Sequence, residues 1–139
     1  MSDGEVDMMA SLNPAEAAVS ITPGLLPESA RTVVFARGTI GNTSYVAIPY
    51  NAANKEGAMV VADFPLDPAA QAHAQDYRQI GSFTVLDLSI LPAAQRKHFE
   101  DLPRSPALPT NAELGIAVPE PHPSWMTRIT SEWEKRYTN

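Results

Sequence analysis

The sequence predicts an α/β fold in which short strands are mixed with helices and the C-terminal half is helical. Two short runs rich in β-branched residues, at residues 32–35 and 44–48, are typical of strands. Three polar residues that precede apolar stretches, Asn13, Asn54 and Asp67, are typical helix caps. Because the runs and the caps follow one another along one chain, we expect a mixed α/β fold.

The chain is expected to open with a strand at residues 5–10 and to continue into a helix that ends near residue 21. Asn13 can cap this helix, and Pro14 suits its first position. Glu16 is placed to reach back to the N–H of the cap residue. The first segment is therefore predicted to be a strand followed by a capped helix.

The next two strands are predicted to pair with each other. Gly38 and Gly41 bracket a turn-rich connection between the runs at residues 32–35 and 44–48. A short connection of this kind favours an antiparallel pair.

Three helices are expected between residues 54 and 102. Asn54 begins the first, and Pro65 is expected to end it early, because the proline ring clashes with the carbonyl four residues back. Asp67 caps the second, which is expected to run to about residue 80. The third is expected at residues 92–102.

A final helix is expected from Ser124, and its apolar residues recur every four positions on one stripe. The stripe consists of Trp125, Ile129, Trp133 and Tyr137. Such a stripe predicts the buried face of a terminal helix. An aromatic platform for a ligand is the alternative.

Residues 103–123 are predicted to be a proline-rich surface segment before the terminal helix, within a chain that forms one unit over residues 1–139. Proline fixes φ and lacks an N–H, so we expect extended, turn-rich chain here. Six of the 13 prolines fall in this segment: Pro103, Pro106, Pro109, Pro119, Pro121 and Pro123.

The composition excludes several classes of protein. The 139 residues contain no cysteine, which excludes disulfide scaffolds, zinc ribbons, thiol nucleophiles and Fe–S sites. The net charge of −6 argues against a nucleic-acid partner and against an anionic membrane surface. No apolar run approaches the ~20 residues of a membrane span, so no membrane insertion is expected. A chain of this size is expected to bury roughly 68% of its unfolded surface, enough for an autonomous core.

The sequence predicts no catalytic residue, no metal site and no cofactor. His73, His98 and His122 lie on separate predicted elements, and none has the spacing of a metal-ligand pair with another histidine. The motifs of a nucleophile elbow, a phosphate-binding loop and a zinc protease are all absent from the sequence. We therefore do not expect an enzyme.

The segment that leads into the first helix is the candidate binding site. Ser11 and Asn13 follow a predicted strand and precede a helix N-terminus, where backbone N–H groups favour anions or polar oxygens. In α/β sheets, ligands gather at the carboxyl ends of strands. Most Asn-Pro caps only start a helix, which is the structural alternative.

An ordered series of motifs runs over nearly the whole chain, at residues 3–9, 13–17, 38–43, 47–52, 55–58, 67–71 and 123–137. This series resembles the C-terminal portion of periplasmic solute-binding proteins of ABC transporters. Within these proteins it is most similar to the YnjB-like branch of extracellular solute-binding protein family 1.

The resemblance implies part of a type II periplasmic-binding-protein fold, in which two α/β lobes joined by crossing strands close over a solute. It implies a non-catalytic protein whose partners are a small-molecule solute and an ABC permease, and a periplasmic location for the parent protein. Ser11 and Asn13 would then face the cleft, and Asn42 and Tyr45 would lie near its mouth. Residues 44–48 would cross between the lobes, the helix from Asn54 would pack on one lobe, and the terminal helices would cover the other.

Members of that family are considerably longer, and their first lobe has no counterpart among these 139 residues. Residues 1–5 are acidic and polar, without the features of a signal peptide. The alternative interpretation is an interaction module that self-associates through exposed strand edges and has no role in transport.

Overall fold

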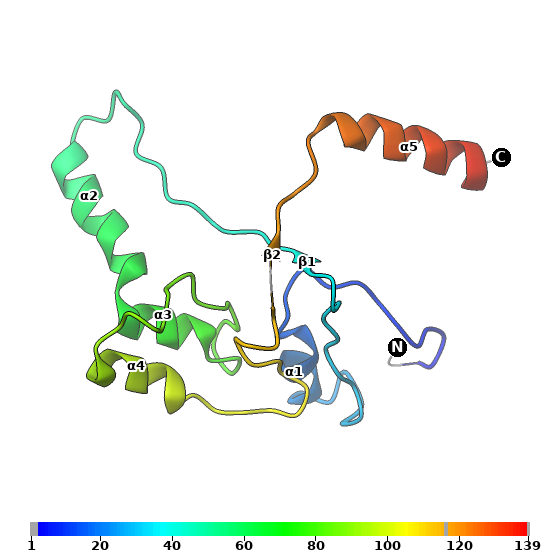
Figure 1. Ribbon diagram of the computed structural model, residues 1–139, viewed down its shortest axis with the longest axis horizontal. Coiled ribbons are helices and arrows are strands. Elements are labelled where there is room, and N and C mark those ends of the chain that lie inside the picture. Colours follow the sequence, from blue (N-terminus) through cyan, green and yellow to red (C-terminus); the bar gives the residue numbers. More distant parts are fainter. Residues whose placement is uncertain (1–2, 116, 139) are drawn as a thin grey trace.

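The computed structural model describes residues 3–115 and 117–138. Its elements are α1 (Glu16–Ile21), β1 (Thr39–Ile40), α2 (Lys55–Asp63), the 3₁₀ helix η1 (Phe64–Leu66), α3 (Pro68–Gln75), α4 (Ala93–Glu100), β2 (Ala117–Val118) and α5 (Ser124–Tyr137). Figure 1 shows α1, α3 and α4 in one body, from which α2 and α5 project on opposite sides.

The helix starts expected at Asn54 and Asp67 are confirmed. The Asn54 side chain accepts a hydrogen bond from the Gly57 N–H at 2.9 Å. One carboxylate oxygen of Asp67 accepts from the N–H groups of Ala69 and Ala70. Side-chain oxygens thus satisfy first-turn donors that have no partner within the helix.

The ends of these helices follow the local polar chemistry. α2 stops just before the 3₁₀ turn that contains Pro65, as expected from the clash of the proline ring with the carbonyl four residues back. α3 ends at Gln75, five residues earlier than expected. There the carbonyl of Asp76 accepts from three N–H groups of the following turn, and its carboxylate accepts from Arg78 Nη2 at 2.8 Å. These hydrogen bonds from Arg78 lower the pKa of the Asp76 carboxyl below its ordinary value.

The strand predictions are wrong. Residues 5–10, 32–35 and 44–48 form no strands. The sheet of the described residues instead pairs β1, inside the predicted turn, with β2 in parallel. The run at residues 32–35 makes hydrogen bonds to other segments and not to a partner strand. The Thr32 N–H donates to the Ala107 carbonyl, and the Thr32 hydroxyl donates to the Pro14 carbonyl. An isolated two-stranded hairpin is also marginal without a third strand or a covering helix.

The best-packed part of the molecule surrounds α1. Ala17 and Ala18 of this helix are buried together with Ala107 of the proline-rich segment, and Tyr77 packs against them. The same segment supplies β2 and the buried Ala107, so it is more than an external connection. Its docking on α1 ties the C-terminal third of the chain to the first helix.

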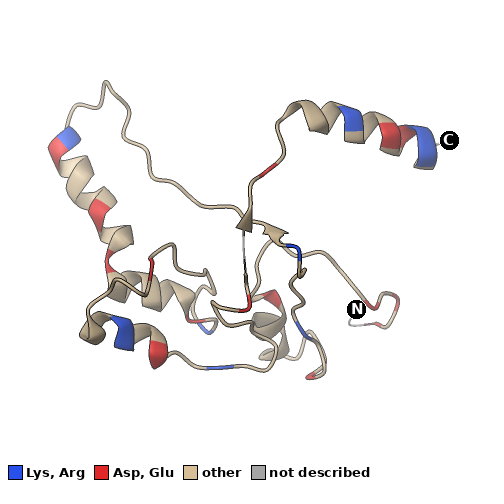
Figure 2. Cartoon of the chain, viewed as in Figure 1, with Lys and Arg blue, Asp and Glu red and all other residues tan. Residues whose placement is uncertain are grey.

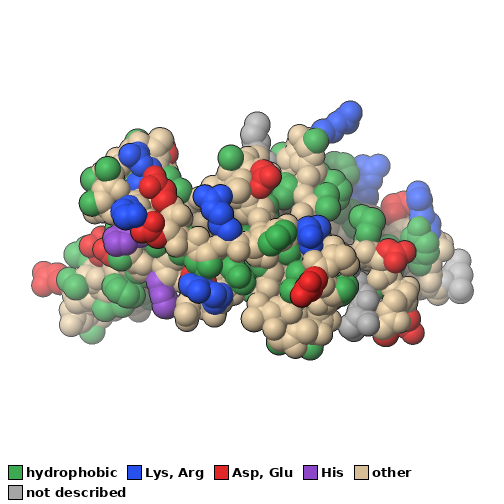
Figure 3. Space-filling model, turned by 90° about the horizontal axis from the view of Figure 1, so that it is seen from below, with side chains coloured by type: hydrophobic (Ala, Val, Ile, Leu, Met, Phe, Trp, Pro, Cys, Tyr) green, Lys and Arg blue, Asp and Glu red, His purple; other side chains and the backbone are tan. Residues whose placement is uncertain are grey.

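The core is too small for a chain of this length. The buried apolar residues of the described chain are Ala15, Ala17, Ala18, Ala72, Phe99 and Ala107. The accessible surface is 11187 Å², whereas a compact protein of this mass exposes about 7,000 Å². The chain therefore buries only about half of its unfolded surface. The expected autonomous core is not present, and Figure 3 shows apolar side chains spread over the surface.

The terminal helix departs most from expectation. Trp125, Ile129, Trp133 and Tyr137 are each more than half exposed, so the prediction of a buried stripe is wrong. α5 contacts no other helix or strand among the described residues. Figure 1 shows α5 at the end of the connection that follows β2, residues 119–123, which extends away from the rest of the molecule.

No helix in the described ranges is both long enough and apolar enough to cross a lipid bilayer.

Replacement of Gly81 tests the docking of the loop after α3 onto α1. Gly81 has φ +74°, and a Cβ there would lie 2.8 Å from the Cβ of Ala15, which is fully buried. Gly24 has nearly the same φ, +77°, but open space around it. We expect Gly24→Ala to lower the free energy of unfolding by about 1–2 kcal/mol through strain alone, and Gly81→Ala by about 2–4 kcal/mol. Urea unfolding measures both, and equal losses would contradict the close packing on α1.

Candidate functional site

Ser11 and Asn13 form one hydrogen-bonded turn before α1. The Asn13 side-chain oxygen accepts from the Ala15 N–H at 2.9 Å. The predicted cap is wrong in its place, because α1 begins only at Glu16, its N-cap is Ala15 and no side chain caps it; the Asn13 bond orders the turn before the helix. The Asn13 N–H donates to Ser11 Oγ at 3.1 Å, and the Ser11 hydroxyl donates to the Asn13 carbonyl at 3.0 Å. Glu16 does not reach back as expected, because its carboxylate accepts from Ser20 instead.

This turn uses most of the polar groups of the predicted site. The Ser11 hydroxyl is both donor and acceptor within the turn, and the Asn13 side-chain oxygen accepts from the Ala15 N–H just before α1. The two N–H groups of the Asn13 side chain have no partner within the described part of the chain. They are the donors that this turn can offer to a ligand.

Asn42 and Tyr45 lie in the extended segment that follows β1. The Gly41 N–H donates to the Val118 carbonyl at 3.0 Å and so fixes the start of this segment against β2. Beyond it the chain has no regular structure, and the Tyr45 side chain is 87% exposed. Both side chains are therefore presented to solvent.

The structure brings the four predicted residues together only in part. Ser11 is bonded to Asn13, and Asn42 shares a segment with Tyr45, but no hydrogen bond among the described residues joins the two pairs. Neither of the two hollows described next is lined by any of them.

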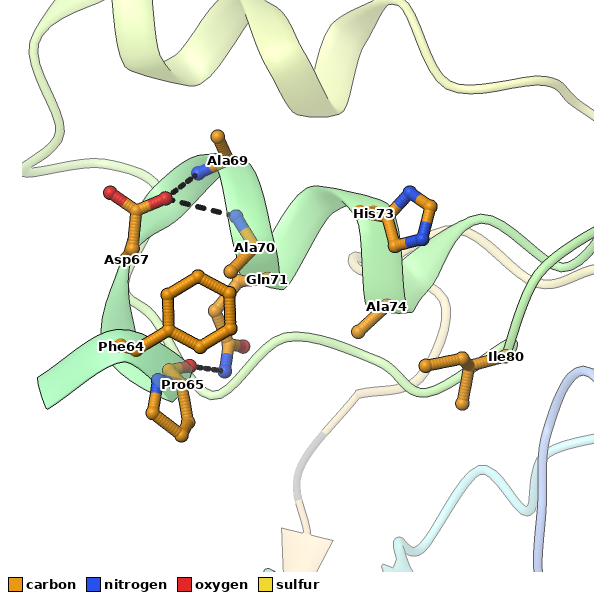
Figure 4. Close-up of a pocket in the computed structure, with 9 residues that line it drawn as sticks. All are labelled: Phe64, Pro65, Asp67, Ala69, Ala70, Gln71, His73, Ala74 and Ile80. Atoms are coloured by element: carbon orange, nitrogen blue, oxygen red, sulfur yellow. Dashed lines mark hydrogen bonds between the residues drawn. The ribbon is translucent and has the colours of Figure 1, made fainter. Parts of the chain in front are cut away.

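Sequence reasoning missed an open hollow of about 510 Å³ beside α3, shown in Figure 4. Its lining comes from η1, α3 and the loop that follows α3: Phe64, Pro65, Asp67, Ala69, Ala70, Gln71, His73, Ala74 and Ile80. We call it the α3 hollow. Three of the lining residues are alanines of α3, a pattern visible in the sequence at residues 69–74. Phe64 and Ile80 stand at its rim, with exposed fractions of 70% and 59%.

Two polar side chains of the α3 hollow are engaged within the chain, whereas the ring of His73, which also lines it, makes no hydrogen bond among the described residues. The Asp67 carboxylate caps α3. The Gln71 side-chain oxygen accepts from the Thr84 hydroxyl and the Val85 N–H, and its N–H₂ donates to the Pro65 carbonyl. The lining of the hollow is mostly apolar, and the exposed His73 ring is its unbonded polar group among the described residues.

A second, shallower hollow of about 380 Å³ runs along α5. The rings of Trp133 and Tyr137 lie 4.5 Å apart, and the Arg128 guanidinium lies 5.8 Å from the Trp125 ring. The stripe thus forms a preorganised aromatic face, and Figure 2 shows charges of both signs along the same helix.

In the described ranges, no group of three or more histidine, aspartate or glutamate residues is arranged to hold a metal ion.

Comparison with known proteins links this chain to a longer relative. The chain is 37% identical over 134 residues to Protein YnjB of Escherichia coli (strain K12). The alignment covers 96% of this chain and 33% of that protein, so the chain spans about a third of the relative's length. This likeness agrees with the motif series that resembles YnjB-like proteins. No protein-family model matches the chain. No solved structure matches it.

Asn13→Ala tests how much the turn bond between the Asn13 side chain and the Ala15 N–H stabilises the start of α1. The substitution removes the acceptor of the Ala15 N–H, so we expect the free energy of unfolding to fall by about 1 kcal/mol. Asn13→Asp keeps the acceptor and should retain most of the stability. Urea unfolding of the two variants decides the point, and an Asn13→Ala protein as stable as the original would show that the bond contributes nothing.

Proposed function

We propose that this chain is the C-terminal portion of a solute-binding component of an ABC-type importer. It contributes one side of a cleft that captures a small solute without chemical change, and the parent protein delivers the solute to a membrane permease from the periplasm. The fold we propose for the parent is the two-lobed type II periplasmic-binding-protein fold.

The observation that carries the proposal is the alignment with Protein YnjB. It runs through 134 residues, almost the whole of this chain, while it takes up only 33% of the relative. The motif series that resembles solute-binding proteins covers the same residues. A stretch that corresponds to one part of a longer protein is expected to expose the surfaces that the remainder would cover.

The shape of the chain supports this interpretation. The surface in excess of a compact protein, about 4,000 Å², is what a chain exposes when a neighbouring part is absent. The segment with Asn42 and Tyr45 is extended and exposed, and Asn13 keeps two side-chain donors. A tyrosine ring and amide N–H groups are suited to a small, uncharged or anionic solute.

The second candidate is a self-associating module without a transport role. It is favoured by one observation, the aromatic face of α5 that no element of the described chain covers.

Tyr45→Ala tests the proposed site, and Tyr50→Ala is its matched control. Both tyrosines are almost fully exposed, at 87% and 89%, but only Tyr45 belongs to the proposed site. Native mass spectrometry of the protein with a panel of amino acids, sugars, polyols and small anions should reveal a bound, chemically unchanged solute. We expect Tyr45→Ala to weaken its binding about tenfold, which corresponds to the loss of about 1.4 kcal/mol. Tyr50→Ala should leave binding unchanged. No binding from the panel, or equal losses in the two variants, would contradict the proposal.

A further inference from the structure

We infer that residues 42–48 are a strand without its partner, and that the partner is a strand from the part of a longer, YnjB-like parent that lies outside this chain. The inference rests on the proposal that the chain is one portion of a longer protein, and it is independent of the solute. It concerns the backbone of the segment, whereas the solute proposal concerns the side chains of Asn42 and Tyr45.

The first support is the residue types of the segment. Residues 44–48 include one aromatic and two β-branched residues, which favour a strand, and neither glycine nor proline interrupts residues 42–48. None of these seven residues is acidic or basic. Strands that stay at the exposed edge of a sheet usually carry charged residues, lysine above all, that prevent further pairing. The composition therefore favours a strand that is paired with a neighbour in the complete protein.

The second support is the state of the backbone. Figure 1 shows the chain following a long, open path from β1 to α2, and residues 42–47 are all exposed. Within the described ranges, no N–H or carbonyl of residues 42–48 takes part in a hydrogen bond. Residues 84 and 85 differ, because the side chains of Gln75 and Gln71 accept from their N–H groups. The segment after β1 thus offers a row of backbone donors and acceptors, which is what a strand binds.

The third support is that the chain cannot supply the partner by extending its own sheet. The Gly41 N–H donates to the Val118 carbonyl at 3.0 Å, so residues 42–48 continue β1 just beyond the end of β2. The continuation of β2 has proline at every second position: Pro119, Pro121 and Pro123. Successive N–H groups of a strand point to opposite sides, so these prolines remove the donors from one edge of residues 119–123. The missing strand must come from another source.

The fourth support is the comparison that names this source. The alignment with Protein YnjB covers 96% of this chain but only 33% of that protein, so the larger part of the relative has no counterpart here. Residues 42–48 are a place where such a remainder would join this chain through backbone hydrogen bonds.

Amide hydrogen exchange tests the inference on two samples. One is the isolated chain, and the other is a hybrid in which this chain replaces the aligned part of Protein YnjB. In the isolated chain, we expect the amides of residues 43–48 to exchange as fast as those of an unfolded peptide. In the hybrid, every second amide of the segment should exchange at least about a hundredfold more slowly, because pairing along one edge uses alternate N–H groups. The aligned segment of intact Protein YnjB should show the same protection, which keeps the test decisive even with a hybrid that does not fold.

Proline substitution provides the second measurement. Val46→Pro and Ala47→Pro each remove one N–H, whereas the matched control Val46→Thr keeps the N–H and the branched shape. Because neighbouring N–H groups point to opposite sides, one of the two proline variants should lower the melting temperature of the hybrid more than the other. Neither should lower the urea midpoint of the isolated chain, where these N–H groups have no partner among the described residues. Val46→Thr should leave both proteins unchanged.

Three outcomes would overturn the inference. They are an unprotected segment in both the hybrid and intact Protein YnjB, proline variants of the hybrid that are as stable as Val46→Thr, and protection that already appears in the isolated chain and grows with its concentration. The last would make a second copy the partner strand. A hybrid whose segment is protected but which binds no solute from the panel would sustain this inference and contradict the solute proposal, so the two failures are distinguishable.

Discussion

The burial of apolar surface is the constraint on which the rest of this structure depends. Only one large side chain, Phe99, is buried in the described chain, and the other buried apolar residues are alanines. Each alanine removes little more than a methyl group from water, and a methylene-sized group contributes about 0.8 kcal/mol. Such a core gives a marginal free energy of folding once the chain entropy is set against it. The exposed tryptophans and valines of α5 and α2 are the surface with which a covering partner would supply the missing burial.

The body formed by α1, α3 and α4 is ordered largely by polar side chains that make hydrogen bonds to nearby backbone groups. The Gln71 side chain accepts from the Val85 N–H, and the Gln75 side chain accepts from the Thr84 N–H. These two bonds hold the segment extended without a neighbouring strand. Asp76 closes the turn after α3, and Asn13 orders the turn before α1. These bonds are local or bridge short loops, so each one orders its own turn and none of them joins α2 or α5 to the body. A binding partner, whether a solute with a second lobe or a second copy, would therefore contact segments whose local conformation is already fixed and whose apolar surface is still exposed.

The local signals of the sequence predicted the helices well. Asn54, Pro65 and Asp67 mark real helix boundaries, because caps and proline act through atoms only a few residues away. The strands could not be predicted in the same way. The β-branched run at residues 32–35 bonds to the turn before α1 and to Ala107, and β1 pairs with residues nearly eighty positions distant. Strand pairing depends on partners far along the chain, which a local pattern does not encode.

The candidate site was predictable to the same limited degree. That the Asn13 side chain accepts a nearby backbone N–H followed from its residue type, but the start of α1 at Glu16 did not, nor did the bond of the Asn13 N–H to Ser11 instead of Glu16. The α3 hollow was missed because it arises where η1, α3 and the following loop meet, although the run of alanines gave a signal. The stripe on α5 was recognised correctly as one face, and its burial was wrongly assumed because a stripe does not say which surface covers it.

The most direct test of the account is the dependence of unfolding on protein concentration. If the remainder of a longer parent and not a second copy covers this chain, the urea midpoint of the 139-residue protein should stay the same as its concentration increases, because no association then stabilises the folded state. The unfolding should be followed by circular dichroism from about 1 µM to about 100 µM, a range that spans typical dimer affinities. A midpoint that rises steadily through this range, in a protein that forms dimers, would contradict the central claim.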